Sequence, residues 1–153
     1  MYCAGFIQGP CPPGWQGFNG GKCFKYYSSK KTWTEALRNC QQCSSNPTST
    51  LASIPDSATN DFLLSSVAPL NSPGLWVGGH QNSAGTWGWS DGTRWSYQKW
   101  YPGEPNNSGG IEDHIELMTV NNKWGYFRGK WNDHRNSFKA PYICQLCRFL
   151  FCF

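Results

Sequence analysis

Charged residues are scarce in this sequence, and no long apolar run accompanies that scarcity. Only 14% of the 153 residues are charged while 16% are aromatic, which excludes a disordered chain kept in solution by its charge. No window reaches the roughly 18 consecutive apolar residues that a membrane-spanning helix needs, and the start lacks a signal-peptide pattern. The 13 Lys and Arg residues are scattered, so we expect no nucleic-acid partner. The length and the lack of repeats predict one soluble, mature domain.

Cysteine, by contrast, is abundant. The eight cysteines stand toward the two ends of the chain, at positions 3, 11, 23, 40, 43, 144, 147 and 152. An even number favours disulfide bonds, which persist in oxidising compartments, and therefore predicts a secreted protein. Cys40-Gln-Gln-Cys43 and Cys144-Gln-Leu-Cys147 offer the alternative of a four-thiolate zinc site. Because residues 44–143 separate the two pairs, whereas zinc ribbons close over roughly 15–20 residues, we favour disulfides.

The N-terminal part predicts an arm and then a helix. Residues 1–23 are rich in Gly and Pro, so we expect an irregular arm in which Cys11 and Cys23 could close a local hairpin. Thr32-Trp-Thr-Glu35 has the pattern of a capping box, and apolar residues follow it at helical spacing. We therefore expect a helix over residues 32–42.

Further along, a second helix is expected to begin at residue 56 or 57 and to end before Pro69, with Phe62 and Leu63 buried. Short strand patterns follow at Leu75–Gly78, Ile115–Thr119, Lys123–Trp124 and Ala140–Gln145. Residues 79–114 are too long for an ordinary connection and too aromatic for a linker. We expect this segment to be a functional loop.

Oxygen-bearing side chains gather in and after this loop. Glu104 and Asn106 flank Pro105, Glu112 follows, and Asn132-Asp133 comes later. Calcium takes about six to eight oxygen ligands from carboxylates and carbonyls, so these residues predict a calcium site. A cis peptide bond before Pro105 would turn Glu104 and Asn106 to the same side of the backbone. Taken one at a time, each motif could equally be a turn or a loop end.

The order of the motifs resembles a C-type lectin domain, a calcium-dependent carbohydrate-recognition module, over about residues 11–146. The motifs that carry the resemblance are Cys11-Pro-Pro-Gly-Trp15, Cys23-Phe-Lys-Tyr26, Leu51-Ala-Ser-Ile54, Leu75-Trp-Val-Gly78, Trp87-Gly-Trp-Ser-Asp-Gly92, Glu104-Pro-Asn106, Trp131-Asn-Asp133 and Tyr142-Ile-Cys144. The resemblance implies an α+β, double-loop fold with two helices, small antiparallel sheets and a long calcium- and sugar-binding loop. It divides the chain into an arm (1–10), the domain (11–146) and an apolar, Cys-containing tail (147–153).

The resemblance also implies a site, in which five residues hold one calcium ion (Ca²⁺) and bind two neighbouring sugar hydroxyls. The five are Glu104, Asn106, Glu112, Asn132 and Asp133. Glu before the proline and Asn after it is the family's mannose-type arrangement, which suits glycans with equatorial 3- and 4-hydroxyls such as mannose, fucose or N-acetylglucosamine. Trp95 or Trp100 could flank the sugar, the alternative being burial beneath the loop. The other functional reading is a lectin-like domain that contacts proteins or mineral surfaces without binding sugar.

The resemblance implies the pairing of four of the eight cysteines. The resemblance pairs Cys11 with Cys23 and Cys40 with Cys144. The remaining cysteines, Cys3, Cys43, Cys147 and Cys152, allow three pairings. We favour Cys43–Cys147 with Cys3–Cys152, because the first pair parallels Cys40–Cys144 three residues on. Cys152 could instead link a homodimer.

The chain also departs from the family at three positions. A second family disulfide would join the places held here by His114 and Asn136, so both of its cysteines are absent. Asn107 replaces an acid of an auxiliary calcium site, so we expect only the sugar-site ion.

The three histidines, His80, His114 and His134, fall in no nucleophile or zinc motif, so we expect a binding protein rather than an enzyme.

Overall fold

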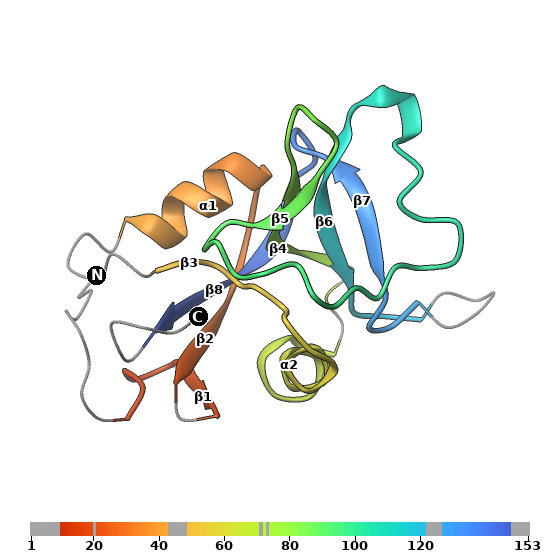
Figure 1. The fold of residues 1–153 in the computed structure, drawn as a ribbon. Helices are drawn as coiled ribbons and strands as arrows, with labels where there is room; N and C mark the ends of the chain where they lie inside the picture. The colour runs from red at the N-terminus through yellow and green to blue at the C-terminus, as the bar shows by residue number, and fades with distance from the viewer. Residues whose placement is uncertain are drawn as a thin grey trace.

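The computed structural model describes residues 10–19, 21–42, 49–70, 72, 74–121 and 127–147, and it is an α+β fold as predicted (Figure 1). The elements are β1 (Gln16–Phe18), β2 (Lys22–Lys31), α1 (Trp33–Gln41), β3 (Thr50–Leu51), α2 (Ser57–Phe62), the π-helix η1 (Leu63–Val67), β4 (Gly74–Gln81), β5 (Trp87–Trp89), the 3-10 helix η2 (Ser108–Gly110), β6 (Glu112–Met118), β7 (Trp131–Arg135) and β8 (Ala140–Cys147). No helix in these ranges is long and apolar enough to cross a membrane. The strand expected at 123–124 lies outside the described residues.

The strands form one sheet in the order β1-β2-β8-β4-β6-β7, with β3 paired to β8 and β5 to β4. The pairs are antiparallel except for the parallel bridge of β4 with β8 at Trp76 and Tyr142. This order places β7 at an edge of the sheet. In Figure 1 the long connection from β5 to β6 runs beside that edge. The edge strand and the loop therefore carry the predicted site together.

Each face of the sheet has its own apolar cluster, because successive strand residues point to opposite faces. Along β4, Leu75 and Val77 belong to one cluster, which includes Leu63 of η1. Trp76, between them, belongs to the other, which includes Trp33 of α1. The two helical segments thus cover opposite faces.

The predicted helices are confirmed at their starts. The Thr32 side chain accepts from Glu35 N and the Glu35 side chain accepts from Thr32 N, so the capping box that begins α1 is present. The carboxylate of Asp56 caps α2 by accepting from Thr59 N. Leu63 is fully buried as expected. Phe62 is only half-buried and stacks on Phe18, with ring centroids 4.6 Å apart.

The N-terminal segment is more regular than predicted. Its last part pairs as a hairpin of β1 and β2, and the ten-residue β2 also pairs with β8. The sequence of β2 hides this role, because its Lys, Ser and Tyr residues lack the alternation of a half-buried strand. The expectation of an irregular arm through residue 23 is therefore wrong for residues 16–18 and 22–23.

Two of the implied disulfides are confirmed. Cys11 bonds to Cys23 and Cys40 bonds to Cys144. The second bond ties α1 to β8 across 104 residues, and cross-links over loops of that length contribute roughly 4–5 kcal/mol in the chain-entropy account. Cys3, Cys43 and Cys152 lie outside the described residues, so the proposed second set of bonds and the dimer link stay predictions. Cys147 is buried at the end of β8.

Candidate functional site

The centre of the site is the turn at residues 104–108. The peptide bond between Glu104 and Pro105 is cis. The side chains on either side of the proline meet, since Asn106 Nδ2 donates to Glu104 Oε1 at 3.0 Å. Asn106 Oδ1 in turn accepts from Ser108 N at 3.0 Å. The turn therefore holds the polar ends of Glu104 and Asn106 together.

Asp133 joins this turn to the edge strand. Its side chain is completely buried, and its two oxygens accept from the backbone N–H groups of Asn106 (3.0 Å) and Asn107 (2.7 Å). In β7 it pairs with Ile115 of β6, so it lies on the face of the sheet that η1 covers. A buried carboxylate with two backbone donors is a rigid anchor for the loop.

Glu112 closes the loop from its other end. Its Oε2 accepts from Ser108 N at 3.0 Å, and its own backbone N–H donates to Asn107 Oδ1 at 3.1 Å. Asn107 takes a left-handed conformation, φ 46°, which Asn tolerates better than most residues. Asn107 therefore helps to shape the loop, a role beyond the predicted loss of an auxiliary calcium site. Sequence reasoning missed this role, although a short polar side chain in a Gly-rich turn is a signal for it.

Electrostatic repulsion is concentrated at these carboxylates. Burial and the neighbouring Asp133 carboxylate raise the pKa of Glu104 to about 7, and Glu112 contributes in the same direction. Within the described residues the one contact of the salt-bridge type joins His114 Nδ1 to Asp113 Oδ1 at 2.6 Å, and it involves no Lys or Arg. No Lys or Arg side chain of those residues is therefore paired with the acids of the loop.

This donor set suits a hard cation. Counting only His, Cys, Asp and Glu side chains, no group of three in the described ranges gathers as a metal site. The predicted set, however, combines carboxylates with the amide oxygens of Asn106 and Asn132, and calcium accepts both kinds of ligand. A carboxyl whose pKa is raised by burial and by neighbouring acids, with no cationic partner, is a group whose ionised form a bound cation would stabilise.

Asn132 stands next to Asp133 but points to the other face of the sheet, as neighbouring strand residues do. Its Nδ2 donates to Glu116 Oε2 at 3.4 Å. Burial raises the pKa of Glu116 to about 6. Sequence reasoning missed Glu116, although a charged residue between Ile115 and Leu117 in a predicted strand is a recognisable signal.

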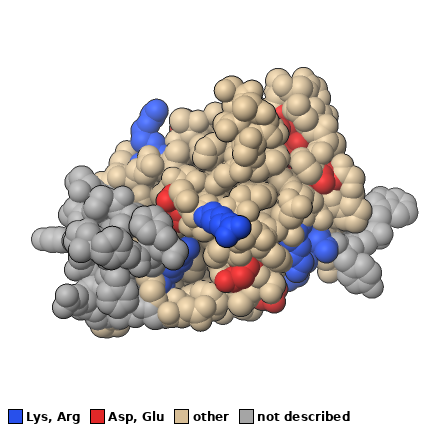
Figure 2. Space-filling model, viewed as in Figure 1, with Lys and Arg blue, Asp and Glu red and all other residues tan. Residues whose placement is uncertain are grey.

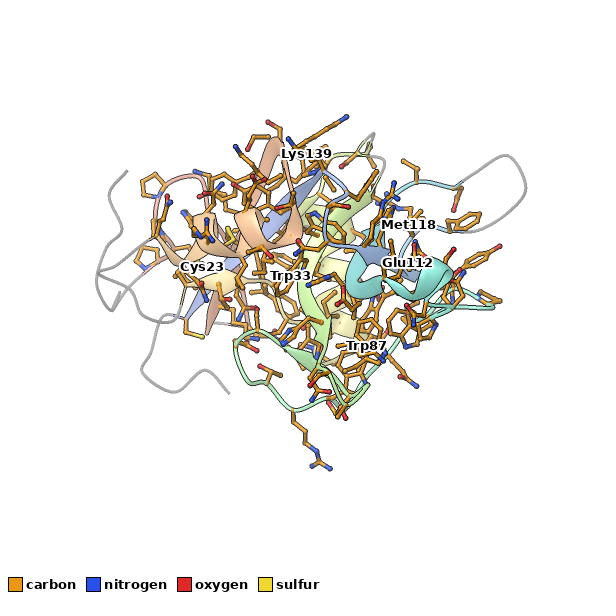
Figure 3. All side chains as sticks on the ribbon, turned by 90° about the horizontal axis from the view of Figure 1, so that it is seen from above. Cys23, Trp33, Trp87, Glu112, Met118 and Lys139 are labelled. Carbon is orange, nitrogen blue, oxygen red and sulfur yellow. A yellow bond between two sulfur atoms is a disulfide. The ribbon has the colours of Figure 1, made fainter. Side chains whose placement is uncertain are left out.

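The tryptophans near the loop form one packed group. Trp131 is fully buried. The centroid of its ring lies 5.9 Å from that of Trp95 and 5.8 Å from that of Trp100. Both neighbours are half-buried, so burial under the loop is only partial. Figure 3 shows Trp87 and Glu112 on one side of the molecule, away from Cys23.

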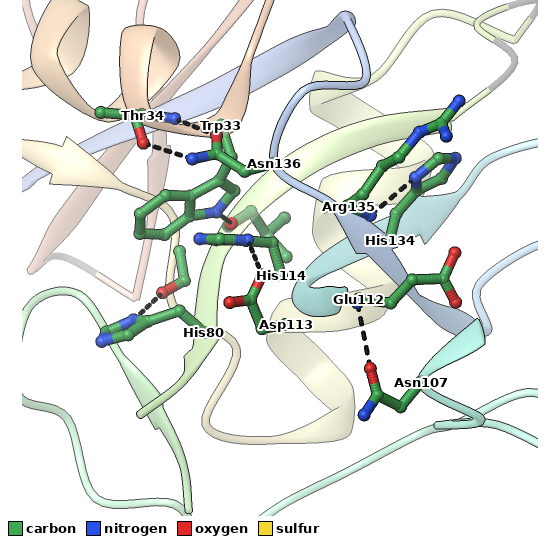
Figure 4. A network of polar contacts seen from close by, with 12 residues as sticks. Trp33, Thr34, His80, Asn107, Glu112, Asp113, His114, His134, Arg135 and Asn136 are labelled. Carbon is green, nitrogen blue, oxygen red and sulfur yellow. Dashed lines mark hydrogen bonds and ion pairs between the residues drawn. The ribbon is translucent and has the colours of Figure 1, made fainter. Parts of the chain in front are cut away.

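Asn136 and His114, which stand where the family's second disulfide would be, make noncovalent contacts with α1. Asn136 Nδ2 donates to Thr34 Oγ1 at 2.7 Å, and Asn136 Oδ1 accepts from Thr34 N, so the segment after β7 is tied to the start of α1 (Figure 4). The His114 ring packs on Trp33 with centroids 4.3 Å apart. Burial lowers the pKa of His114. Noncovalent contacts to α1 thus replace the missing covalent tie.

The face of the molecule seen in Figure 2 carries scattered charges. On the face shown in Figure 2, Lys and Arg residues stand singly among uncharged residues, and Asp and Glu residues are scattered between them. The described residues of this face therefore form no basic stripe of the kind that a phosphate backbone requires.

Sequence comparisons identify relatives over most of the chain. A family model described as "Lectin C-type domain" matches residues 29–146. A protein named "Lectin" from Pleurodeles waltl is 38% identical over 146 residues, which cover 91% of this chain and 79% of that protein. A "C-type lectin mannose-binding isoform" from Oxyuranus scutellatus is 36% identical over 142 residues, covering 91% and 84%.

Solved structures match as well. The C-type lectin CEL-I from Cucumaria echinata superposes with a TM-score of 0.79 at 26% identity, covering 90% of this chain and 98% of that chain. A calcium-independent type II antifreeze protein superposes with a TM-score of 0.72 at 27% identity, covering 90% and 95%. Similar folds thus include one named a lectin and one named calcium-independent.

Proposed function

The chain belongs to the C-type lectin family, and on that premise we propose that it is a calcium-dependent lectin of mannose-type specificity. The family consists of binding domains rather than enzymes, which agrees with the absence of a nucleophile motif in the sequence. The proposed ligands of the ion are Glu104, Asn106, Glu112, Asn132 and Asp133. The proposed target is a glycan with equatorial 3- and 4-hydroxyls outside the cell or on a microbe.

One observation carries the proposal: Glu104, Asn106 and Asp133 meet where the loop contacts β7, at a place rich in acceptor oxygens and without a paired cationic side chain among the described residues. A bound calcium ion would supply the positive charge and accept one lone pair from each of two sugar hydroxyls. The chain's own groups would complete the recognition. Carboxylate oxygens accept the hydroxyl protons, and the amide nitrogen of Asn106 donates to a hydroxyl oxygen.

The direct test is binding to immobilised mannose. We expect the protein to be retained in millimolar calcium chloride and released by a chelator or by free mannose. Galactose should release it poorly. Strong retention that a chelator does not reduce would contradict calcium dependence. No retention on mannose even in calcium chloride would favour the lectin-like alternative that binds no sugar; one structure of similar fold is that of a calcium-independent antifreeze protein.

Calcium affinity should fall in mild acid. Glu104 has a pKa of about 7 in the ion-free protein and must lose its proton to bind calcium, so apparent affinity should drop about tenfold per pH unit below that value. Isothermal titration with calcium chloride between pH 8 and pH 5 measures it. An affinity independent of pH over this range would contradict the assignment of Glu104.

The stability of the ion-free protein should change in the opposite direction. A carboxyl whose folded pKa is raised binds its proton more tightly in the folded state, so stability increases as pH falls from about 7 toward the ordinary value. With calcium bound, Glu104 stays ionised and stability decreases as pH falls. Thermal melts of wild type and Glu104→Gln with and without chelator isolate this contribution, because the variant cannot titrate at that position.

A further inference from the structure

Glu116 is a buried acid whose role the proposed ligand set does not explain. It lies in β6, between β4 and β7, and only 8% of its surface is exposed. Its register partners are Trp76 in β4 and Asn132 in β7. Neighbouring Ile115 and Leu117 point to the opposite face and belong to the apolar cluster there. Glu116 therefore stands on the α1 face of the sheet, directly across from Asn132.

The carboxylate has a polar partner but no cationic one. Asn132 Nδ2 donates to Glu116 Oε2 at 3.4 Å. No ion pair of Glu116 occurs among the described residues, where the single pair is that of His114 and Asp113. Burying an acid is costly unless hydrogen bonds compensate, so its retention inside a sheet calls for a specific partner. Asn132 is that partner.

The neighbouring strand leaves room for the carboxylate. A Cβ atom at Gly74 would collide with Glu116 Oε1 and would also lie too close to Cδ. The carboxyl end of Glu116 therefore occupies the space that a side chain at position 74 would take. The side chain of Glu116 therefore contacts residues of both strands that flank β6, Gly74 of β4 and Asn132 of β7.

The side-chain amide of Asn carries an oxygen and an NH₂ group, which are similar in size but differ in hydrogen-bonding role. The oxygen can bind a cation, whereas the NH₂ group can only donate. A carboxylate accepts only, so Glu116 selects the orientation in which Nδ2 of Asn132 points into the sheet. The amide oxygen of Asn132 is then the atom of the group that can act as a ligand.

We infer that Glu116 is a positioning residue that fixes the amide of Asn132, so that its oxygen is presented as a ligand. The effect of Glu116 on calcium binding rests on the proposed function. The contact between Glu116 and Asn132 is independent of that function, because it is present in the ion-free chain. Partners behind a metal ligand commonly change metal affinity by about ten- to a hundredfold when removed.

The first test uses the wild-type protein without calcium. In nitrogen-15 NMR with chelator present, the side-chain amide protons of Asn132 should exchange with water more slowly than those of the exposed Asn82. Glu116→Gln should keep the protection, because its carbonyl oxygen can still accept, and Glu116→Met should remove it. Equal exchange of Asn132 and Asn82 in wild type would overturn the inference, whatever the behaviour of the variants.

The second test measures calcium affinity by titration with calcium chloride. Glu116→Met should weaken binding about ten- to a hundredfold, and Glu116→Gln should stay within about threefold of wild type. In an Asn132→Ala background, Glu116→Met should have no further effect, because the partner it orients is gone. An equal loss in both backgrounds would show that Glu116 does not act through Asn132. No calcium binding by wild type would instead refute the proposed function, and the NMR test would still decide the pair.

Discussion

Replacing Asp133 with Asn is expected to abolish sugar binding at millimolar calcium and to weaken calcium binding by more than about a hundredfold. Asp133 supplies a negative charge to the proposed site and also accepts the backbone N–H groups of Asn106 and Asn107. Removing a partner behind a ligand already costs about ten- to a hundredfold, and this variant removes a ligand charge as well. Calcium titration and mannose retention measure both effects.

The same substitution should lower the stability of the ion-free protein. The new side-chain amide at position 133 would place its NH₂ group against a backbone N–H, which leaves one buried donor without an acceptor and costs about 1–3 kcal/mol. Asp61→Asn is the matched control, because it makes the same chemical change at an exposed carboxylate of α2. Wild-type calcium affinity in Asp133→Asn would exclude Asp133 from the site.

Exchanging Glu104→Gln together with Asn106→Asp is expected to shift preference from mannose toward galactose. Acceptor and donor change places across the proline, while the loop keeps its charge and both ion-binding oxygens. The contact between residues 104 and 106 can persist in reverse, with the amide of position 104 donating to the acid at 106. The measurement compares retention on a mannose support with retention on a galactose support, both at saturating calcium.

The gain for galactose should be modest. Galactose also needs an aromatic surface for its apolar face, and Trp95 and Trp100 are committed to packing on Trp131. Glu104→Gln alone is the matched control, since it loses a charge and should weaken calcium binding without favouring galactose. A double variant that keeps the mannose preference unchanged would show that residues 104 and 106 do not read the sugar hydroxyls.

Some features could be predicted from sequence because their causes are local. The capping box of α1 needs only Thr32 and Glu35, three residues apart, and the predicted start matches. The cap at Asp56 is equally local. The proline at 105 makes a cis form of the preceding peptide bond accessible. Where the determinant lies within one turn of chain, composition and spacing were sufficient.

Other features depend on partners far along the chain. The β2 segment does not alternate like a half-buried strand, and its pairing with β8, more than a hundred residues away, makes it a central strand. Glu116 carries no motif, and its role follows from register with Asn132 and from the missing side chain at Gly74. Neither relation is visible in a window of sequence.

By itself, then, the sequence determined the helix starts, the Cys-rich frame and the identity of the polar residues around Pro105. The tertiary structure decided which of those residues meet: it placed Asp133 under the backbone of Asn106 and Asn107 and gave Asn132 a buried acid as its partner. The reason is physical. Helix caps arise from contacts a few residues apart, whereas a site at the edge of a sheet forms only when the register of β6 with β7 brings distant side chains to one place.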